Sequence, residues 1–333
     1  MIALMCLAAC VIYSGILGDV FTPLLSSIGM PDSLNSRSSN ILVITLSMLF
    51  PMGLIQDLSG LAFTSILGFA AVIYTVVFLT IRSIDGTYSL DNNGKFITSA
   101  LKELPAFEKY SHWNFGFNSL NLLSNLALAY IAHYNSPSFY WELENTSPKN
   151  YTKMVGISFA LLVTLYTLSM LTGYVTFGDV CKGNILLNYH PDDVLSTTAR
   201  AATGFSILFG YPLVLRGARQ ALQGVAATLL GPSYNKLTSR QFTTLVGLIL
   251  TFVTIVAITV KDISVVVGLT GAIMGSFIVF IIPALVTIRS MEKKFGSDSA
   301  EYQKSKINFA LVPLGVAIAA LGSFMTLKEA GII

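Results

Sequence analysis

Long apolar stretches recur along this chain, and they constrain its fold more than any other feature. Spanning a hydrocarbon core about 30 Å thick takes about 20 mostly apolar residues in a helix. We therefore predict an all-α integral membrane protein with about nine transmembrane helices. The predicted spans are Ile2–Leu25, Ile41–Ile55, Leu61–Ile81, Phe115–Pro137, Met154–Phe177, Leu195–Leu215, Thr243–Val260, Ile263–Ile288 and Ile307–Leu327.

Composition agrees with a membrane protein and excludes several functions. The chain is 53% hydrophobic and 11% charged, whereas soluble domains are about 25% charged. The net charge of +3 includes no basic patch, so nucleic acid is excluded as a partner. Common hydrolase, nucleotide-binding and zinc motifs are missing, and the few His and Cys residues lack metal-ligand spacing. We therefore expect that the chain is not an enzyme and holds no metal site. We expect membrane lipid to surround it.

Loop charges predict the orientation of the chain. Lys and Arg favour cytoplasmic loops, and they are more numerous in the loops after even-numbered spans. This places the N-terminus in the cytosol and makes 82–114 an extracytosolic loop. The sequons at Asn145 and Asn150 would then lie in the cytosol, so a glycan on either one would invert the topology.

Polar side chains within the apolar stretches are candidates for function, because groups that are costly to bury in lipid usually line a pathway. In the first stretch they are Tyr13, Ser14 and Asp19. Asp19 lies near the end of the stretch, and two interpretations stay open. It is either a carboxylate at the membrane interface or a pathway-lining or coupling acid.

The fourth stretch carries Asn118, Asn121 and Asn125 at a spacing that places them on one helix face. These amides either hydrogen-bond to another helix or line a site, because lipid cannot satisfy them. Farther along, Pro137 lacks an N–H group and its ring disfavours an unbroken helix. A break there would expose backbone groups for ligand binding, as in discontinuous transporter helices.

Prolines and glycines indicate further local features. The Gly-x-Pro sequence that ends at Pro212 predicts a weak point in the sixth stretch. Pro51 and Pro283 predict kinks, and the spacing Gly271-x-x-x-Gly275 predicts close helix packing.

Several blocks together resemble the amino acid/auxin permease superfamily, which includes sodium-coupled neutral and vacuolar amino acid transporters. The blocks cover most of the chain. They are Tyr13 with Gly18-Asp19, PMGLIQDLSGL at 51–61 with Thr64-Ser65, His133-Tyr134-Asn135 with Glu142-Leu143, GYVTFG at 173–178, NILLNY at 184–189 and Tyr211-Pro212.

The resemblance implies a LeuT-like inverted-repeat transporter fold in a single transmembrane domain. Aligned in this way, the first stretch corresponds to the third of eleven family helices, so the first two helices and half of the expected site are absent. The implied parts are 1–81, the remainder of the first repeat; 82–114, the extracytosolic loop; 115–289, the second repeat; and 290–333, a cytosolic loop and the last helix.

The resemblance also implies a site for a small zwitterion. The implied substrate-binding residues are Tyr13, Asn125, Ala129, Tyr130, Ser206 and Phe209, and the implied coupling or gating residues are Asp19 and His133. Ala129 and Tyr130 belong to a segment that departs from the family pattern, which leaves the substrate open. The nearest hydroxyl before Tyr211-Pro212 is Ser206, so the co-transported ion is either H+ or Na+, with no other cofactor.

The implied function is secondary active transport of amino acids, chiefly neutral ones, by alternating access. The implied location is the plasma membrane or a vacuolar or lysosomal membrane. The alternative is a truncated, non-transporting paralogue or a membrane amino acid sensor. A channel is disfavoured, because the sequence has no filter-like run or acidic ring.

Overall fold

The computed structural model describes residues 1–31, 35–55, 62–89, 94–97, 116, 119–131, 136–231, 234 and 236–332. All regular elements in these ranges are helices, which confirms the all-α prediction at this level. Contacts divide the chain into two compact units. The first comprises Met1–His112 and Phe159–Ile263, and the second comprises Trp113–Ser158 and Ser264–Ile333.

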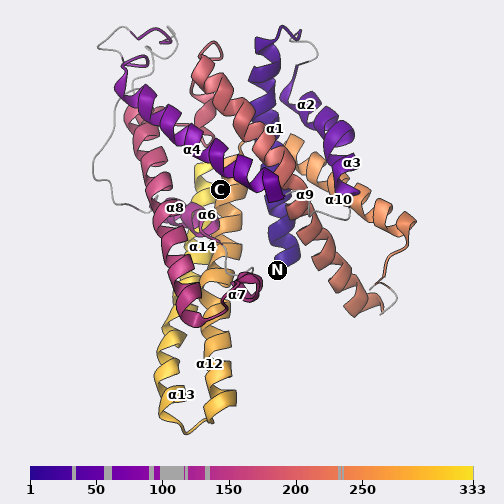
Figure 1. Cartoon of the computed structure of the whole chain (residues 1–333), viewed down its shortest axis with the longest axis vertical. Coiled ribbons are helices and arrows are strands. Elements are labelled where there is room, and N and C mark those ends of the chain that lie inside the picture. The colour runs from indigo at the N-terminus through magenta and orange to yellow at the C-terminus, as the bar shows by residue number, and fades with distance from the viewer. Residues whose placement is uncertain are drawn as a thin grey trace. The chain divides into compact units, whose positions relative to one another are not determined.

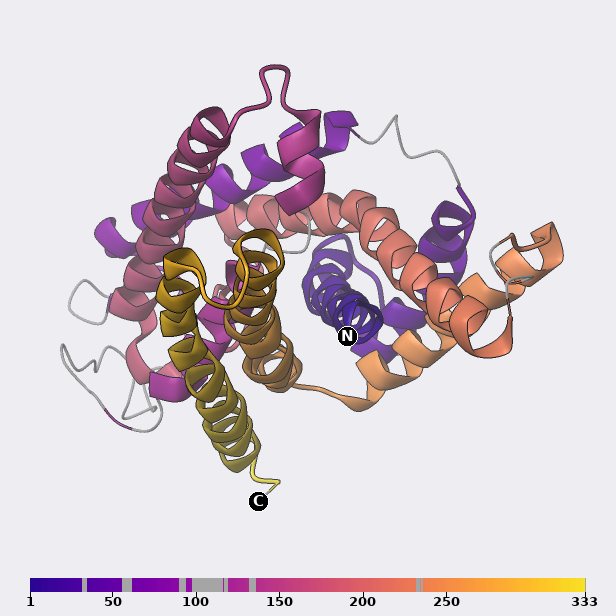
Figure 2. The ribbon, with the colours of Figure 1, turned by 90° about the horizontal axis from the view of Figure 1, so that it is seen from below.

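Helix α1 (Ile2–Ser27) is the core of the first unit, and it packs against α9, α10 and α2 (Figure 1). Figure 2 shows α1 nearly end-on, with α9 and α10 running past it. Two glycines permit close contacts, since a Cβ at Gly15 would lie 2.8 Å from the Ile263 side chain and one at Gly18 would lie 2.6 Å from Ile41. The other elements of this unit are α2 (Arg37–Ile44), η1 (Thr45–Leu49), α3 (Phe50–Gly53), α4 (Ala62–Ile84), most of α8 (Pro148–Phe177), η4 (Gly178–Val180), η5 (Ile185–Leu187), α9 (Val194–Leu230) and α10 (Ser239–Thr259).

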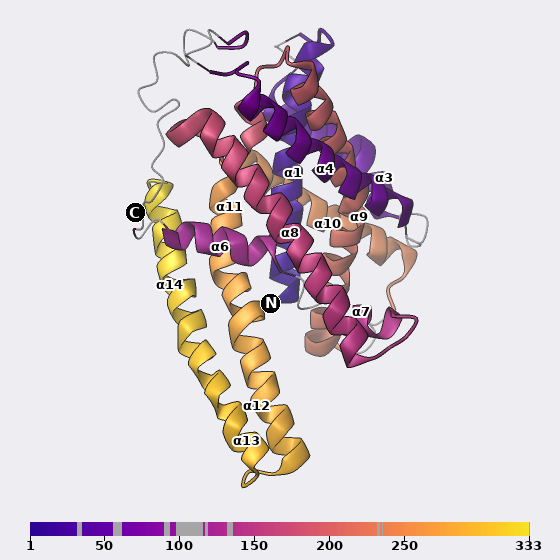
Figure 3. The same ribbon diagram turned by 60° about the vertical axis from the view of Figure 1, so that its left-hand side comes forward.

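In the second unit, helix α6 (Ser119–Ala129) packs crosswise on η7 (Gly271–Ile281) and α14 (Leu311–Glu329) (Figure 3). The close packing predicted for Gly271 and Gly275 is confirmed. A Cβ at Gly271 would lie 1.9 Å from the carbonyl oxygen of Ser124, and one at Gly275 would lie 3.0 Å from the Ala127 Cβ. The remaining elements are α7 (Ser136–Glu142), the start of α8, α11 (Ile263–Thr270), α12 (Ile282–Phe295), α13 (Ala300–Ser305) and η8 (Lys306–Ala310).

Six helical segments in the described ranges are long and apolar enough to cross a membrane: Ile2–Ser27, Ile66–Ile84, Pro148–Val180, Ser239–Thr259, Ile263–Phe295 and Ala300–Glu329. The other three predicted spans are not among these six segments. Ile41–Ile55 falls largely on α2, η1 and α3, and Leu195–Leu215 lies within α9. Phe115–Pro137 is described only in part, and its helix α6 ends at Ala129, so this stretch is not one continuous helix.

Two of the prolines follow π-helical segments. Pro51 comes directly after η1 and Phe50, and Pro283 follows η7 and Ile282. A π turn shifts the register of the backbone hydrogen bonds. This shift lets the helix continue past a proline, which has no N–H group to donate. Pro212, where the sequence predicts a weak point, does not end its helix, because α9 continues from Val194 to Leu230. Pro212 is buried there, and its missing N–H removes one intrahelical bond without ending the helix.

Candidate functional site

The Tyr13 region joins two of the family-like sequence blocks within the first unit. The Ser14 Oγ lies 3.0 Å from the Tyr211 hydroxyl in a buried hydrogen bond that links α1 to α9. The ring of Tyr13, which is half-buried, lies 6.3 Å from the Tyr211 ring. Tyr211 thus anchors the packing of the two helices, while Tyr13 keeps part of its surface accessible.

Ser206 and Phe209 line a cavity of about 360 Å3 between α4 and α9. Ser206 lies where the two helices approach closely, since a Cβ at Gly68 would be 2.8 Å from the Ser206 Oγ. The Phe209 side chain is exposed. Aromatic rings and hydroxyl groups both contribute to the wall, which suits an amphiphilic small molecule. The other lining residues are Leu67, Ala70, Ala71, Tyr74, Thr198, Ala202 and Phe205.

Asp19 lies at a junction of three helices. Its carboxylate is 8% exposed and accepts a 2.7 Å hydrogen bond from Nε of Arg37, which begins α2. The same guanidinium donates from Nη1 to the carbonyl oxygen of Ala257 in α10, at 2.9 Å. Asp19 is therefore a paired and buried carboxylate within the first unit. A buried pair of this kind can hold helices together or separate during a conformational change.

The second unit contains the other described candidates. Helix α6 ends at Ala129, the N–H of Tyr130 still bonds to the carbonyl of Leu126, and the N–H of Ile131 bonds to that of Leu128. Asn125 lies one turn before the end of the helix, and its Oδ1 is buried with no hydrogen-bond partner among the described residues. An unpaired buried acceptor is costly, so Asn125 is a position where a bound ligand or water would lower that cost. His133 and Asn118 lie outside the described residues.

Sequence reasoning missed an ionic network in the first unit. Arg82 of α4 forms a bidentate ion pair with Asp193. Its Nε donates to Oδ2 at 2.8 Å and its Nη2 donates to Oδ1 at 2.6 Å. The Tyr88 hydroxyl donates to Asp193 Oδ2 at 3.1 Å and accepts from the His190 N–H at 2.9 Å. Asp193 also caps α9 through the N–H of Leu195. Arg82 and Asp193 lie 111 positions apart, so no local pattern indicates their pairing.

The family-like blocks 173–178 and 184–189 supply side chains that pack against the residues of this network. Tyr88 and Tyr189 meet with ring centroids 5.0 Å apart, and Phe177 lies 4.9 Å from Tyr189. Arg200 of α9 donates to the carbonyls of Leu186, at 2.8 Å, and Tyr189, at 2.6 Å. Burial raises the pKa of both tyrosines, so their hydroxyls stay protonated and available as donors at neutral pH. These blocks therefore stabilise the start of α9.

Asp85 provides a pH test of this network. Burial disfavours its charge, but hydrogen bonds from Thr87 and the neighbouring Arg82 outweigh that effect, and the pKa of Asp85 lies below its ordinary value of 3.8. A lowered folded-state pKa contributes stability above the ordinary pKa, and this contribution is lost as the pH falls through the folded-state value.

We expect Asp85→Asn to lower the thermal stability at neutral pH. The melting-temperature difference from the wild type should shrink steadily below pH 3.8. Melting curves recorded over this range in one buffer series measure it. A difference that stays constant with pH would contradict the assigned ion pair.

A chain whose described elements are all helices, six of them long and apolar enough to cross a bilayer, is a multi-pass integral membrane protein. Its sequence matches a family model described as transmembrane amino acid transporter protein over residues 1–328, and the chain belongs to that family. The resemblance predicted from the sequence blocks is thereby confirmed. The family is one of transporters rather than enzymes.

Curated relatives are similar to most of the chain. Vacuolar amino acid transporter 5 of Schizosaccharomyces pombe is 25% identical over 284 residues, which cover 85% of this chain and 63% of the relative. Putative sodium-coupled neutral amino acid transporter 11 of Mus musculus is 25% identical over 297 residues, which cover 88% of this chain and 59% of the relative. Sodium-coupled neutral amino acid transporter 7 of Xenopus laevis is 23% identical over 339 residues, which cover 98% of this chain and 70% of the relative. The chain thus spans about 60% of the length of the first two relatives.

Proposed function

We propose that this chain carries out secondary active transport of amino acids, with neutral amino acids as the first candidates. The observation that carries the proposal is the family match over residues 1–328. The cavity that contains Ser206 and Phe209 supports it, because its wall combines aromatic and hydroxyl groups. The end of α6 at Ala129 adds backbone groups of the kind that transporters use for ligands.

The finer features of the proposal follow from the resemblance. They are a LeuT-like inverted-repeat fold with nine membrane helices in one domain, alternating access, and coupling to H+ or Na+. Either the plasma membrane or a vacuolar or lysosomal membrane fits the names of the relatives. The proposed substrate-binding residues are Tyr13, Ser206 and Phe209 in the first unit and Asn125, Ala129 and Tyr130 in the second, with Asp19 and His133 in coupling or gating.

Uptake by purified protein in proteoliposomes tests the proposal. We expect saturable uptake of a radiolabelled neutral amino acid, driven by either an imposed pH gradient or a sodium gradient. Phe209→Ala should raise the KM about tenfold, as loss of a hydrophobic contact to a ligand does. Phe252→Ala is the matched control, because Phe252 is an exposed aromatic residue of α10 that does not line the cavity. An equal effect of both variants would remove Phe209 from the site.

The same assay separates the alternatives. A protein that is stabilised against heat by an amino acid but shows no flux would support the sensor interpretation, and one that shows neither would support a non-transporting paralogue. Asp19→Asn tests coupling. We expect this variant to lose the response of uptake to the driving gradient and to keep the exchange of amino acids across the membrane. Loss of folded protein instead would assign Asp19 to helix packing.

A further inference from the structure

Charge is strongly segregated in the first unit. Its described acidic residues are Asp19, Asp85, Asp179, Asp192, Asp193 and Asp262, and none of them lies in the hairpin formed by the second half of α9 and the start of α10. The whole segment 194–261 contains no Asp or Glu. The hairpin nevertheless carries Arg216 and Arg219 within α9, Lys236 in the connection and Arg240 in the first turn of α10. This end of the unit therefore presents positive charge without a carboxylate from its own hairpin.

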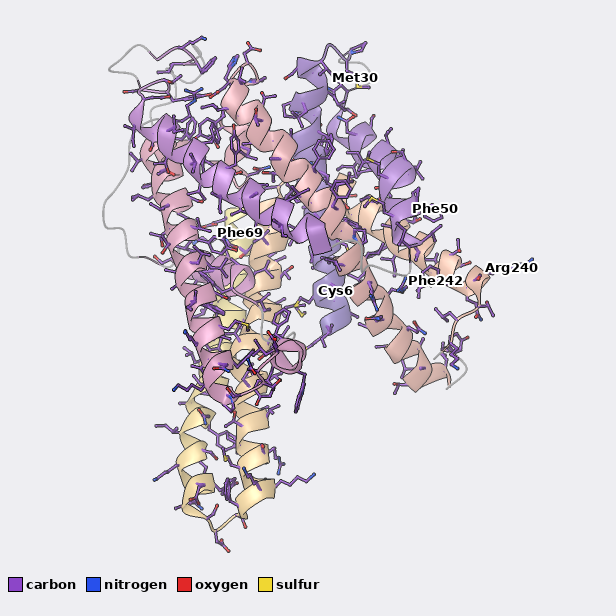
Figure 4. All side chains as sticks on the ribbon, in the orientation of Figure 1. Cys6, Met30, Phe50, Phe69, Arg240 and Phe242 are labelled. Carbon is purple, nitrogen blue, oxygen red and sulfur yellow. The ribbon has the colours of Figure 1, made fainter. Side chains whose placement is uncertain are left out.

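Only one of these bases is used in packing. The guanidinium of Arg219 lies 4.4 Å from the ring centre of Phe242, and its residue is 8% exposed, so it ties α9 to α10. Arg216, Lys236 and Arg240 are exposed and form no ion pair with any described residue. In Figure 4, Arg240 lies at the outer edge of the hairpin, next to Phe242.

A cavity of about 320 Å3 opens beside Arg240, between the end of α9 and the start of α10. Its floor is apolar and includes Leu222, Ala226, Leu245 and Leu248, and Leu248 is 64% exposed. Arg240 and Gln241 line the cavity from the first turn of α10, where the helix dipole favours an anion, and the Gln241 side chain caps the helix by accepting from the Thr238 N–H. The site thus joins an anion-attracting rim to an apolar groove.

We propose that this hairpin binds an anionic phospholipid, with the phosphate headgroup at Arg240 and an acyl chain along Leu222, Ala226 and Leu248. Basic pockets between transmembrane helices on the cytoplasmic side bind anionic headgroups, and each nearby Lys or Arg contributes to the attraction. The predicted orientation places this hairpin in the cytosol, where the leaflet is negatively charged. The proposal does not depend on transport activity.

Native mass spectrometry of the purified full chain in detergent tests the proposal. The probes are dioleoyl phosphatidylglycerol, dioleoyl phosphatidylcholine with the same acyl chains, and inorganic phosphate. We expect the wild-type protein to retain phosphatidylglycerol about fivefold better than phosphatidylcholine, the factor that one basic contact supplies. Arg240→Gln should remove this preference.

Arg289→Gln is the matched control. Arg289 is an exposed arginine of α12 that pairs with Glu292 at 2.8 Å, and it does not line the cavity. The sequence predicts that it lies on the same membrane side as the hairpin. This variant loses the same charge and should keep the lipid preference. Ala226→Trp, which fills the groove, should lower retention of both lipids, and unchanged melting temperatures would show that the variants are folded.

Three outcomes would overturn the proposal. Equal retention of the two lipids would show that the headgroup charge is not recognised. Equal behaviour of Arg240→Gln and Arg289→Gln would show general electrostatic attraction without a site. Inorganic phosphate that competes as well as phosphatidylglycerol would indicate a site for soluble anions.

Discussion

Gly271→Val should prevent the second unit from packing correctly and sharply reduce the yield of folded protein. Any Cβ at this position would lie 1.9 Å from the carbonyl oxygen of Ser124 and 2.7 Å from its carbonyl carbon. Both are backbone atoms of α6, so no rotation of a side chain can relieve the overlap. Overpacking usually costs about 1–3 kcal/mol, and a backbone collision belongs at or above the upper end of that range.

Size-exclusion chromatography of detergent extracts measures this effect as the fraction of monodisperse protein, and melting curves measure it as a lowered Tm. Gly156→Ala is the matched control, because Gly156 is a helical glycine of the same unit and a Cβ there would meet no heavy atom within 4 Å. It should be neutral or stabilise by up to about 1 kcal/mol, owing to the higher helix propensity of Ala. A Gly271→Val protein as stable as this control would show that α6 and η7 do not meet as described.

Asp193→Asn should have the second large effect. The carboxylate is fully buried and accepts hydrogen bonds from Nε and Nη2 of Arg82, the Tyr88 hydroxyl and the N–H of Leu195. Removing one partner of a buried ion pair costs about 3–5 kcal/mol when the other charge is left unpaired. Arg82 keeps its second partner, Asp85, so we expect the loss at the lower end of that range. The first turn of α9 should also lose protection against hydrogen exchange, since its cap is weakened.

Asp192→Asn separates this effect from a general loss of negative charge. Asp192 is the neighbouring residue and its side chain is 82% exposed, with His190 3.6 Å away. It should change the melting temperature little, because exposed pairs contribute about 0–1 kcal/mol. The double variant Arg82→Met with Asp193→Asn should recover part of the loss, since no unpaired charge remains buried. Additive losses in that double variant would rule out the pair.

Local sequence patterns were sufficient for part of the candidate site. Apolar length predicted where the helices lie, and the spacing of Gly271 and Gly275 correctly predicted a close helix contact. The chain is also interrupted before Pro137 as predicted, but α6 already ends at Ala129 and Pro137 lies in the first turn of α7, where proline is tolerated. Pro212 has the same local signal and does not end α9. Packing around a buried proline can outweigh its helix-breaking tendency, and the sequence contains no information on that packing.

Long-range pairing explains what could not be predicted. Asp19 was a candidate because an acid in an apolar stretch is unusual, but its pairing with Arg37 and the link to Ala257 required the folded structure. Arg82 and Asp193 were not candidates at all, because each lies at a helix end where charges are common.

The amino-acid order alone predicted many apolar helices and membership of a transporter family, and it named the candidate site residues. These properties depend on composition and short-range spacing, which are visible along one segment. The partners of Ser14, Asp19 and Asp193 emerged only from the folded chain. Contacts between residues far apart depend on which helix faces meet, and apolar stretches of similar composition do not specify that choice.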